Sequence, residues 1–275
     1  MADEDSITGR ITGDLRRKIQ DYTFGPGALL PSEPELAASY NVSRQTARSA
    51  LRALEQEGLV TVRPRRGRIV RVPPRRAVRD SERHQLEKDN AILPEEERGK
   101  LGEAETNLDM SINDQEFVSK YDIISTPAEI ADVFGITPTT PLLRRRFTST
   151  DPRSGNLLST SVSYIPKSFV EANPAILDEN NEPWPGGTLH ALSTVGIEIM
   201  KVVDEVTARM PSSSESQEWD LPPGIPLLMC RRLSYDREDT LIEISDVWYP
   251  ADRTELRFTT PLKPWDAPPR KKAKR

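Results

Sequence analysis

The chain of 275 residues has few of the side chains on which catalytic and metal sites depend, with one cysteine and two histidines. The single cysteine, Cys230, excludes an internal disulfide, and its apolar neighbours favour a buried, unreactive thiol. The histidines, His84 and His190, lie 106 residues apart in sequence, without an HExxH motif or a cysteine pair. No GxSxG motif or glycine-rich phosphate loop is found either. We therefore expect no metal, no cofactor and no catalytic residues.

Long apolar runs are also missing. No stretch of about 18 apolar residues is found, as a membrane-spanning helix would require. The first residues, Met-Ala-Asp-Glu-Asp, are acidic and do not form the apolar core of a secretory signal. Together with the single cysteine, these features predict a protein of the reducing cytoplasm. The length is sufficient for two domains, each with its own core.

The charge of the chain is unevenly distributed. The net charge is −5, which by itself would argue against a nucleic-acid partner. Residues 41–80, however, contain 11 arginines against three acidic residues, a net charge of +8. Residues 81–269 carry a net charge of −15, and residues 270–275 add five positive charges. A basic patch on an acidic chain predicts a local binding surface for phosphates.

The basic region follows two predicted helices. The first shows apolar residues at every fourth position, namely Ile7, Ile11, Leu15 and Ile19. Ser32 and Glu35 form the capping-box pattern of a second, short helix that ends near Tyr40. Ser43 is the expected N-cap of a third helix, which Gly58 ends.

The third predicted helix carries arginines on one outward stripe, at positions 44, 48 and 52. Like charges at this spacing destabilise an isolated helix by roughly 0.2–0.5 kcal/mol per pair. Arginine pairs well with phosphates and with guanine edges, so the stripe favours DNA contact. The alternative is a solvated basic face without a partner.

A basic hairpin follows the third helix. Valines alternate with other residues on both sides of a turn at residues 64–67, which predicts two short strands. Its arginines are Arg63, Arg65, Arg66 and Arg68, which suit a minor groove or its phosphates. Residues 73–76 read Pro-Pro-Arg-Arg, as expected for a stiff linker. The order of elements predicts a winged helix-turn-helix.

Several short motifs carry a more specific likeness: Leu30-Pro-Ser-Glu33, Leu36-Ala37, Val42-Ser-Arg-Gln-Thr-Ala-Arg48, Ala50-Leu51, Leu54, Glu57-Gly58-Leu59 and Gly67. With them, residues 6–72 resemble the DNA-binding domain of GntR-family transcriptional regulators. Taken with the basic stripe and the hairpin, the resemblance implies a set of DNA contacts: Ser43, Arg44, Gln45, Thr46, Arg48, Arg52, Arg65, Arg66, Gly67 and Arg68. One position departs from the family, because Pro34 stands where members often have Arg.

The C-terminal half alternates strand-like runs with short helices, which predicts an α+β fold. Its motifs are Pro141-Leu-Leu-Arg-Arg-Arg146, Ser163-Tyr-Ile-Pro166, Gly187-Thr-Leu-His190, Gly196-Ile197, Val206-Thr-Ala-Arg209, Leu221-Pro-Pro-Gly-Ile-Pro226, Tyr235-Asp236, Glu243 and Asp252-Arg253. In this order they resemble the UTRA domain of HutC-type GntR regulators. The resemblance implies a mixed α/β fold similar to chorismate lyase, with a cleft that senses a small molecule.

The same resemblance implies effector-binding residues at Arg146, Ser161 or Ser163, Glu243 and Tyr249. Arg146 would bind an anionic group of the effector, and Glu243 and Tyr249 would hydrogen-bond hydroxyls. Two positions depart from the pattern of sugar-phosphate sensors. This chain has Thr148 where such sensors tend to have a second Arg, and Ser161 where they have a carboxylate. The alternative is a structural ion pair between Arg146 and Glu243.

These features predict four segments: a winged helix-turn-helix domain (1–72), a linker (73–84), a UTRA effector-binding and dimerisation domain (85–262) and a basic, disordered tail (263–275). The tail is either a solvated end or an additional, non-specific DNA contact. We expect a dimeric repressor that binds a palindromic double-stranded operator and responds to a small anionic effector. Two alternatives stay open, namely a repressor whose degenerate pocket has no ligand and a lyase-like enzyme with a DNA anchor.

Overall fold

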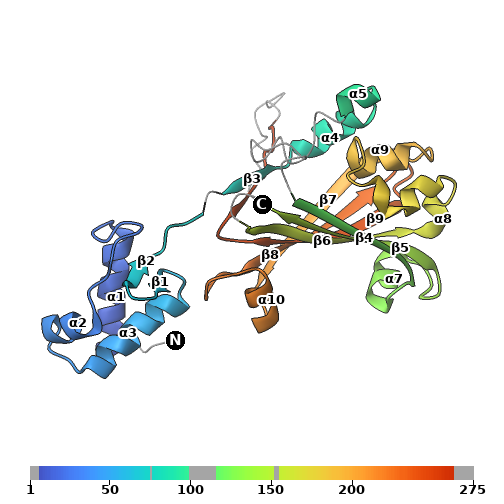
Figure 1. The fold of residues 1–275 in the computed structure, drawn as a ribbon. Coiled ribbons are helices and arrows are strands. Elements are labelled where there is room, and N and C mark those ends of the chain that lie inside the picture. The colour runs from blue at the N-terminus through green and yellow to red at the C-terminus, as the bar shows by residue number, and fades with distance from the viewer. Residues whose placement is uncertain (1–5, 75, 99–115, 152–154, 263–275) are drawn as a thin grey trace, which may run out of the picture.

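The computed structural model describes residues 6–74, 76–98, 116–151 and 155–262. The chain forms two parts, which we call the head (residues 6–70) and the sheet domain (residues 76–98, 116–151 and 155–262) (Figure 1). The predicted basic tail lies outside the described residues. Within the described ranges, no helix has the length and apolar character needed to cross a bilayer.

The head contains three helices and a hairpin, as the sequence predicts for a winged helix-turn-helix. The helices are α1 (Ile7–Gln20), α2 (Glu33–Ser39) and α3 (Arg44–Gln56). Strands β1 (Val60–Arg63) and β2 (Gly67–Val70) pair in antiparallel register and form the wing.

Local capping explains where the helices of the head begin. The Ser6 hydroxyl accepts a hydrogen bond from the Gly9 amide at 2.9 Å. The predicted capping box is present, with the Ser32 amide donating to Glu35 at 2.7 Å. Such caps satisfy backbone N–H groups that have no partner inside the helix. Ten buried residues form the core between the helices and the wing: Ile11, Leu15, Leu30, Leu36, Ala47, Ala50, Leu51, Leu54, Val60 and Val70.

The sheet domain is built on a six-stranded sheet in which every neighbouring pair is antiparallel. In spatial order its strands are β4 (Glu116–Ser125), β5 (Pro141–Thr150), β6 (Leu157–Pro166), β9 (Leu241–Pro250), β8 (Leu227–Tyr235) and β7 (Lys201–Arg209). Because side chains alternate between the two faces of a strand, neighbouring residues of one strand belong to different cores. Leu143 belongs to one core and its neighbour Leu142 to the other.

Helices cover both faces of the sheet (Figure 1). The upper face in that view carries α4 (Arg83–Ala91), α5 (Glu95–Arg98), α8 (Lys167–Val170), η2 (Pro174–Leu177), η3 (Glu179–Asn181) and α9 (Gly187–Ser193). The lower face carries α7 (Ala128–Phe134) and α10 (Ser213–Glu218). The mixed helix and sheet content agrees with the predicted fold class.

The second part of the predicted linker (residues 73–84) contains regular structure. Residues 77–80 form strand β3 (Ala77–Asp80), which pairs in parallel with β10 (Thr254–Arg257). Helix α4 then begins at Arg83, still inside the predicted linker of residues 73–84. The partner strand is remote in the sequence, so the local pattern gave no sign of the pairing. The segment without regular structure between the head and the sheet domain therefore ends before Ala77, earlier than the predicted linker of residues 73–84.

The environment of Cys230 yields a chemical prediction. Its side chain is 4% exposed, and burial, with Asp204 nearby, raises the pKa of the thiol to about 11. A thiol with a raised pKa stays protonated and unreactive at about pH 8. We expect the folded protein to react with Ellman's reagent far more slowly than the protein unfolded in guanidinium chloride. Equal rates in the two states would contradict the burial of this residue.

Candidate nucleic-acid interface and small-molecule face

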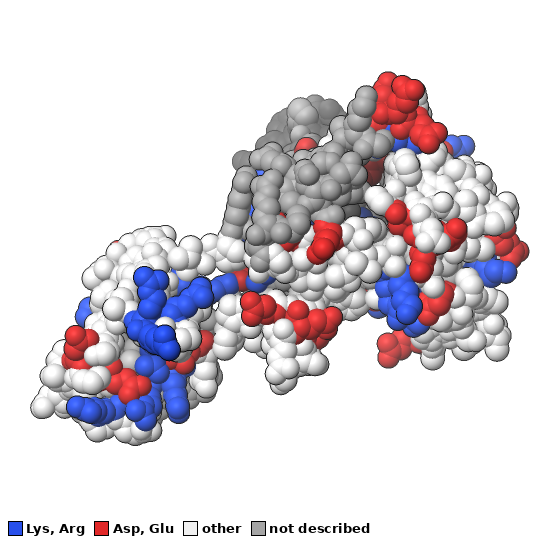
Figure 2. All heavy atoms as spheres, viewed as in Figure 1, with Lys and Arg blue, Asp and Glu red and all other residues white. Residues whose placement is uncertain are grey.

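Helix α3 presents the predicted arginine stripe on its surface. Arg44, Arg48 and Arg52 are all exposed, whereas the opposite side of the helix is buried in the head core. In Figure 2, lysine and arginine side chains gather on the visible face of the head, while the sheet domain shows mixed charges. The three arginines of the stripe therefore lie on the solvent-facing side of α3.

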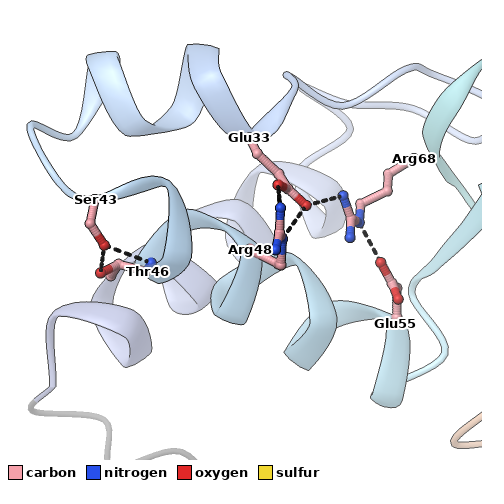
Figure 3. A network of polar contacts seen from close by, with 6 residues as sticks. All are labelled: Glu33, Ser43, Thr46, Arg48, Glu55 and Arg68. Carbon is pink, nitrogen blue, oxygen red and sulfur yellow. Dashed lines mark hydrogen bonds and ion pairs between the residues drawn. The ribbon is translucent and has the colours of Figure 1, made fainter.

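The first turn of α3 is fixed by Ser43. The Ser43 Oγ accepts from the Thr46 amide at 3.1 Å and lies 2.8 Å from the Thr46 hydroxyl (Figure 3). Ser43 and Gln45 are exposed and Thr46 is half-buried. The predicted DNA contacts of this turn thus lie together at the N-terminal end of α3, where backbone N–H groups and the helix dipole favour an anion.

One carboxylate organises the arginines of the head. Glu33 accepts from Arg48 Nε at 3.0 and 3.1 Å, with Arg48 Nη2 at 2.9 Å, and from Arg68 Nη1 at 3.1 Å (Figure 3). Arg68 also donates through Nε to Glu55. The Arg48 guanidinium lowers the pKa of Glu33, and Glu33 in turn raises the pKa of Arg48. Glu33 thereby connects α2, the N-terminal half of α3 and the wing.

This network divides the basic stripe into two classes. Arg48 is held in one orientation, while among the ion pairs between described residues none involves Arg44 or Arg52. Arg68, expected to contact DNA from the wing, has a side chain only 20% exposed between two carboxylates. In the sequence Glu33 belongs to the Leu30-Pro-Ser-Glu33 motif, and no local pattern indicates its partners, which are 15 and 35 residues away.

The tip of the wing keeps its arginines exposed. Arg63 lies opposite Gly67 in the hairpin register, and the turn between them contains Arg65 and Arg66. Gly67 has φ +97°, and an added Cβ would lie 3.3 Å from Leu29 Cδ1, so glycine suits this position. The three arginines are available for a partner beside α3.

The five expected effector residues do not form one site. Ser161, Ser163, Glu243 and Tyr249 share the sheet face that bears α9, because strand alternation and register place them there. Arg146 lies opposite Val162 and points to the other face, where it pairs with Asp122 at 3.5 Å. The expectation that Arg146 faces Glu243 was wrong, and a shift of one residue along a strand explains the error.

Arg145 takes the place expected of Arg146. Its side chain is 2% exposed and donates to Ser163 Oγ at 2.9 Å, Thr188 Oγ1 at 3.1 Å and Glu243 Oε1 at 2.6 Å. Burial alone would lower the pKa of Arg145, but the adjacent Glu243 carboxylate, together with Tyr121 and Glu182, raises it. The Arg145 Nε and Nη2 groups are thus already hydrogen-bonded to groups of the protein itself. A structural ion pair does exist here, but with Arg145 as the cation.

Tyr249 lies in different surroundings from the Arg145 pair. The Arg79 guanidinium stacks 4.5 Å from the centroid of the Tyr249 ring. Tyr249 also lines a cavity of about 10 Å³ with His84, Asp204 and Cys230, which is about the size that admits one water molecule. Asp204 binds His84 Nε2 and Arg232 Nε, each at 3.0 Å, and these contacts hold the pKa of Asp204 well below its usual range despite burial.

Comparison with known proteins gives a match for each part of the chain. Residues 7–70 match the family model described as bacterial regulatory proteins of the gntR family. Residues 115–255 match the model of the UTRA domain, which covers about half of the chain. The two matches agree with the head and with most of the sheet domain.

Individual relatives match either nearly the whole chain or one short segment of it. An uncharacterised HTH-type transcriptional regulator of Rhizobium meliloti is 27% identical over 252 residues, covering 91% of this chain and 93% of the relative. The HTH-type transcriptional repressor NanR of Salmonella newport is 44% identical over 56 residues, 20% of this chain and 22% of the relative. A crystal structure of a GntR-family transcriptional regulator aligns with TM-score 0.68 and 26% identity, covering 94% of this chain and 99% of that one.

The Glu33 network predicts an effect on DNA specificity. Glu33→Gln should release Arg48 and remove a negative charge, so binding to arbitrary DNA rises while specific binding falls by about 1–3 kcal/mol, the value of one oriented arginine–base contact. Glu57→Gln is the matched control, because Glu57 pairs with Arg16 outside the stripe at 2.6 Å. The ratio of the affinity for the specific duplex to that for a random duplex should be lower for Glu33→Gln than for Glu57→Gln. The same ratio in both would contradict a positioning role for Glu33.

The Arg145–Glu243 pair predicts an effect on stability. Glu243→Ala leaves a buried, uncompensated guanidinium and should reduce the free energy of unfolding by about 3–5 kcal/mol. Replacing both residues, with Arg145→Met and Glu243→Leu, should recover most of that loss. Urea unfolding of both variants measures the two effects. A Glu243→Ala variant as stable as the original chain would show that the pair has no structural role.

Proposed function

This chain belongs to the GntR family of bacterial regulatory proteins and carries a UTRA domain, and on that premise we propose that it represses transcription as a homodimer bound to a palindromic operator. A repressor bound to bacterial DNA acts in the cytoplasm. The full-length relatives are transcriptional regulators, and this supports a regulator without catalytic activity.

The observation that carries the proposal is the exposed arginine stripe of α3 beside the arginines of the wing. The major groove of B-DNA is about 12 Å wide and admits an α-helix. With α3 in that groove, Arg44 and Arg48 lie at the end that contacts base edges in helix-turn-helix proteins. The wing arginines then approach the adjacent backbone or minor groove. Repression is supported by the similarity of one segment to NanR.

A dimer follows from the way such modules read DNA. Two heads related by a two-fold axis contact half-sites about 34–36 Å apart, one turn of the double helix. The edge strand β7 exposes Val203 and Val206, and Met200 and Met210 flank it with exposed side chains. An edge strand with unpaired backbone groups and exposed apolar side chains supports a contact between two copies.

The effector is proposed as a small anionic molecule bound on the α9 face of the sheet. The Arg145 side chain supplies the cation, and Ser161, Ser163, Glu243 and Tyr249 supply polar groups of the same face. A second candidate is a repressor that responds to no small molecule. It is favoured by the hydrogen bonds that Arg145 already makes to Ser163, Thr188 and Glu243, because a ligand anion has to displace Glu243.

Selection of bound duplexes from a random DNA library tests the operator. We expect a palindrome to be enriched, and no enrichment above non-specific binding would contradict the proposed function. The selected duplex is then challenged with phosphorylated sugars and small organic acids. Displacement by one compound supports the effector proposal, whereas an unchanged complex and an unchanged melting temperature with every compound favour the ligand-independent repressor.

Arg44→Ala tests base reading by α3. Arg44 is exposed at the first turn of the helix, so its loss should weaken operator binding by about 1–3 kcal/mol and relax the base preference at one position. Arg257→Ala, which removes an exposed arginine from the sheet domain, is the control for charge. Titration of labelled operator measures both. Equal affinities of the two variants would remove Arg44 from DNA readout.

A further inference from the structure

The C-terminal end of α3 lies directly against the sheet domain. A Cβ added to Gly58 would lie 2.8 Å from the Pro223 carbonyl oxygen, and one added to Gly224 would lie 2.9 Å from the Glu57 carbonyl carbon and 3.0 Å from the Gly58 nitrogen. In Figure 1 the segment before β8 reaches the end of α3. The two backbones are therefore in contact at a place where neither side has room for a side chain.

Both glycines also have a backbone conformation that favours glycine. Gly58 has φ +71° and Gly224 has φ +79°, values that residues with a Cβ rarely adopt. Gly58 follows α3 and ends it, while Gly224 belongs to the loop between α10 and β8. Ile225 and the neighbouring Leu221 anchor that loop in a small core with Trp219 and Leu227. The loop is thus a firm support for the helix end.

A second contact holds the chain between the two parts. The Arg71 amide donates to the Leu59 carbonyl at 2.9 Å, and the Arg71 guanidinium pairs with Asp252, whose side chain is 3% exposed. Six residues later, the Ala77 amide donates to the Arg253 carbonyl at 2.8 Å. The connection is thus bonded at both ends to consecutive residues of the sheet domain, Asp252 and Arg253.

These contacts leave the DNA-reading surface open. The end of α3 that contacts the sheet domain is its C-terminus, and the predicted base contacts lie at its N-terminus. The helix has 13 residues. At 1.5 Å per residue, the two ends are about 20 Å apart. The contact thus does not block DNA, but it does fix the direction in which α3 points from the sheet domain.

We propose that the Gly58–Gly224 contact and the Arg71–Asp252 pair position α3 for operator binding by setting the separation of the two recognition helices in the dimer. The inference rests on the proposed function, because separation matters only when two heads bind one palindrome. Rigid coupling lets both heads bind when the half-sites are spaced correctly, whereas loose coupling tolerates other spacings at a lower effective concentration.

The test compares operators with different half-site separations, bound to the full chain and to Gly224→Ala. The original chain should prefer one separation by about tenfold or more over separations altered by a few base pairs. Gly224→Ala should bind the preferred operator about tenfold more weakly and accept the altered separations almost equally well. Its affinity for a duplex with a single half-site should be unchanged, because the head itself is intact.

Gly196→Ala is the matched control. Gly196 has φ +82°, close to that of Gly224, but no other atom lies within 4 Å of an added Cβ. Arg71→Ala is a second variant, which removes the ion pair with Asp252 and leaves the glycine contact untouched. Its control is Arg76→Ala, because Arg76 is an exposed arginine of the same connection. We expect Arg71→Ala to lose spacing preference and both controls to retain it.

The outcomes separate the two proposals. If the original chain shows spacing preference and both Gly224→Ala and Arg71→Ala keep it, the positioning proposal is overturned while the dimeric repressor stands. If Gly224→Ala and Arg71→Ala lose single half-site binding as well, the contacts maintain the head and do not position it, which also overturns the proposal. If the unmutated chain binds operators of all half-site separations equally well, the proposal that a dimer binds a palindromic operator is itself contradicted.

Discussion

Pairing between arginine and carboxylate is the interaction on which both parts of this protein depend. Glu33 holds Arg48 and links α2, α3 and the wing. Glu243 holds Arg145 inside the sheet domain. Arginine suits this role because its guanidinium stays charged and presents several donors in a fixed plane. Where such a pair is buried, as at Glu243, removing one partner costs more than the pair contributes, so the pair constrains the fold more than it stabilises it.

The arginines outside these pairs explain the functional assignment. Arg44 and Arg52 on α3, with Arg65 and Arg66 on the wing, keep exposed charges on a chain whose net charge is −5. Residues 81–269, with a net charge of −15, repel DNA, so the orientation of the basic head relative to the sheet domain becomes important. A sensing domain can change DNA binding only through a difference between arrangements of the heads, and the end of α3 is the part that the sheet domain contacts.

Local motifs predicted the head well because its signals lie within a few residues of one another. The capping box and the four-residue spacing of the stripe in α3 predicted where helices begin and which sides face outward. Contacts between remote segments were not predictable in this way. Strand periodicity alone cannot say which of Arg145 and Arg146 faces Glu243, because both choices fit a strand. The pairing of β3 with β10, and the approach of Gly224 to α3, depend on residues more than 150 positions away.

The most direct test of the account is the dependence of operator affinity on salt concentration. Each phosphate contact releases condensed counterions, so a dimer with about 6–10 such contacts should lose about 10³–10⁵ in affinity between roughly 50 and 200 mM salt. A steep, linear decrease of log affinity with log salt is the predicted result, and would agree with two basic heads on DNA. A flat dependence would contradict the claim that the exposed arginines of α3 and the wing bind phosphates.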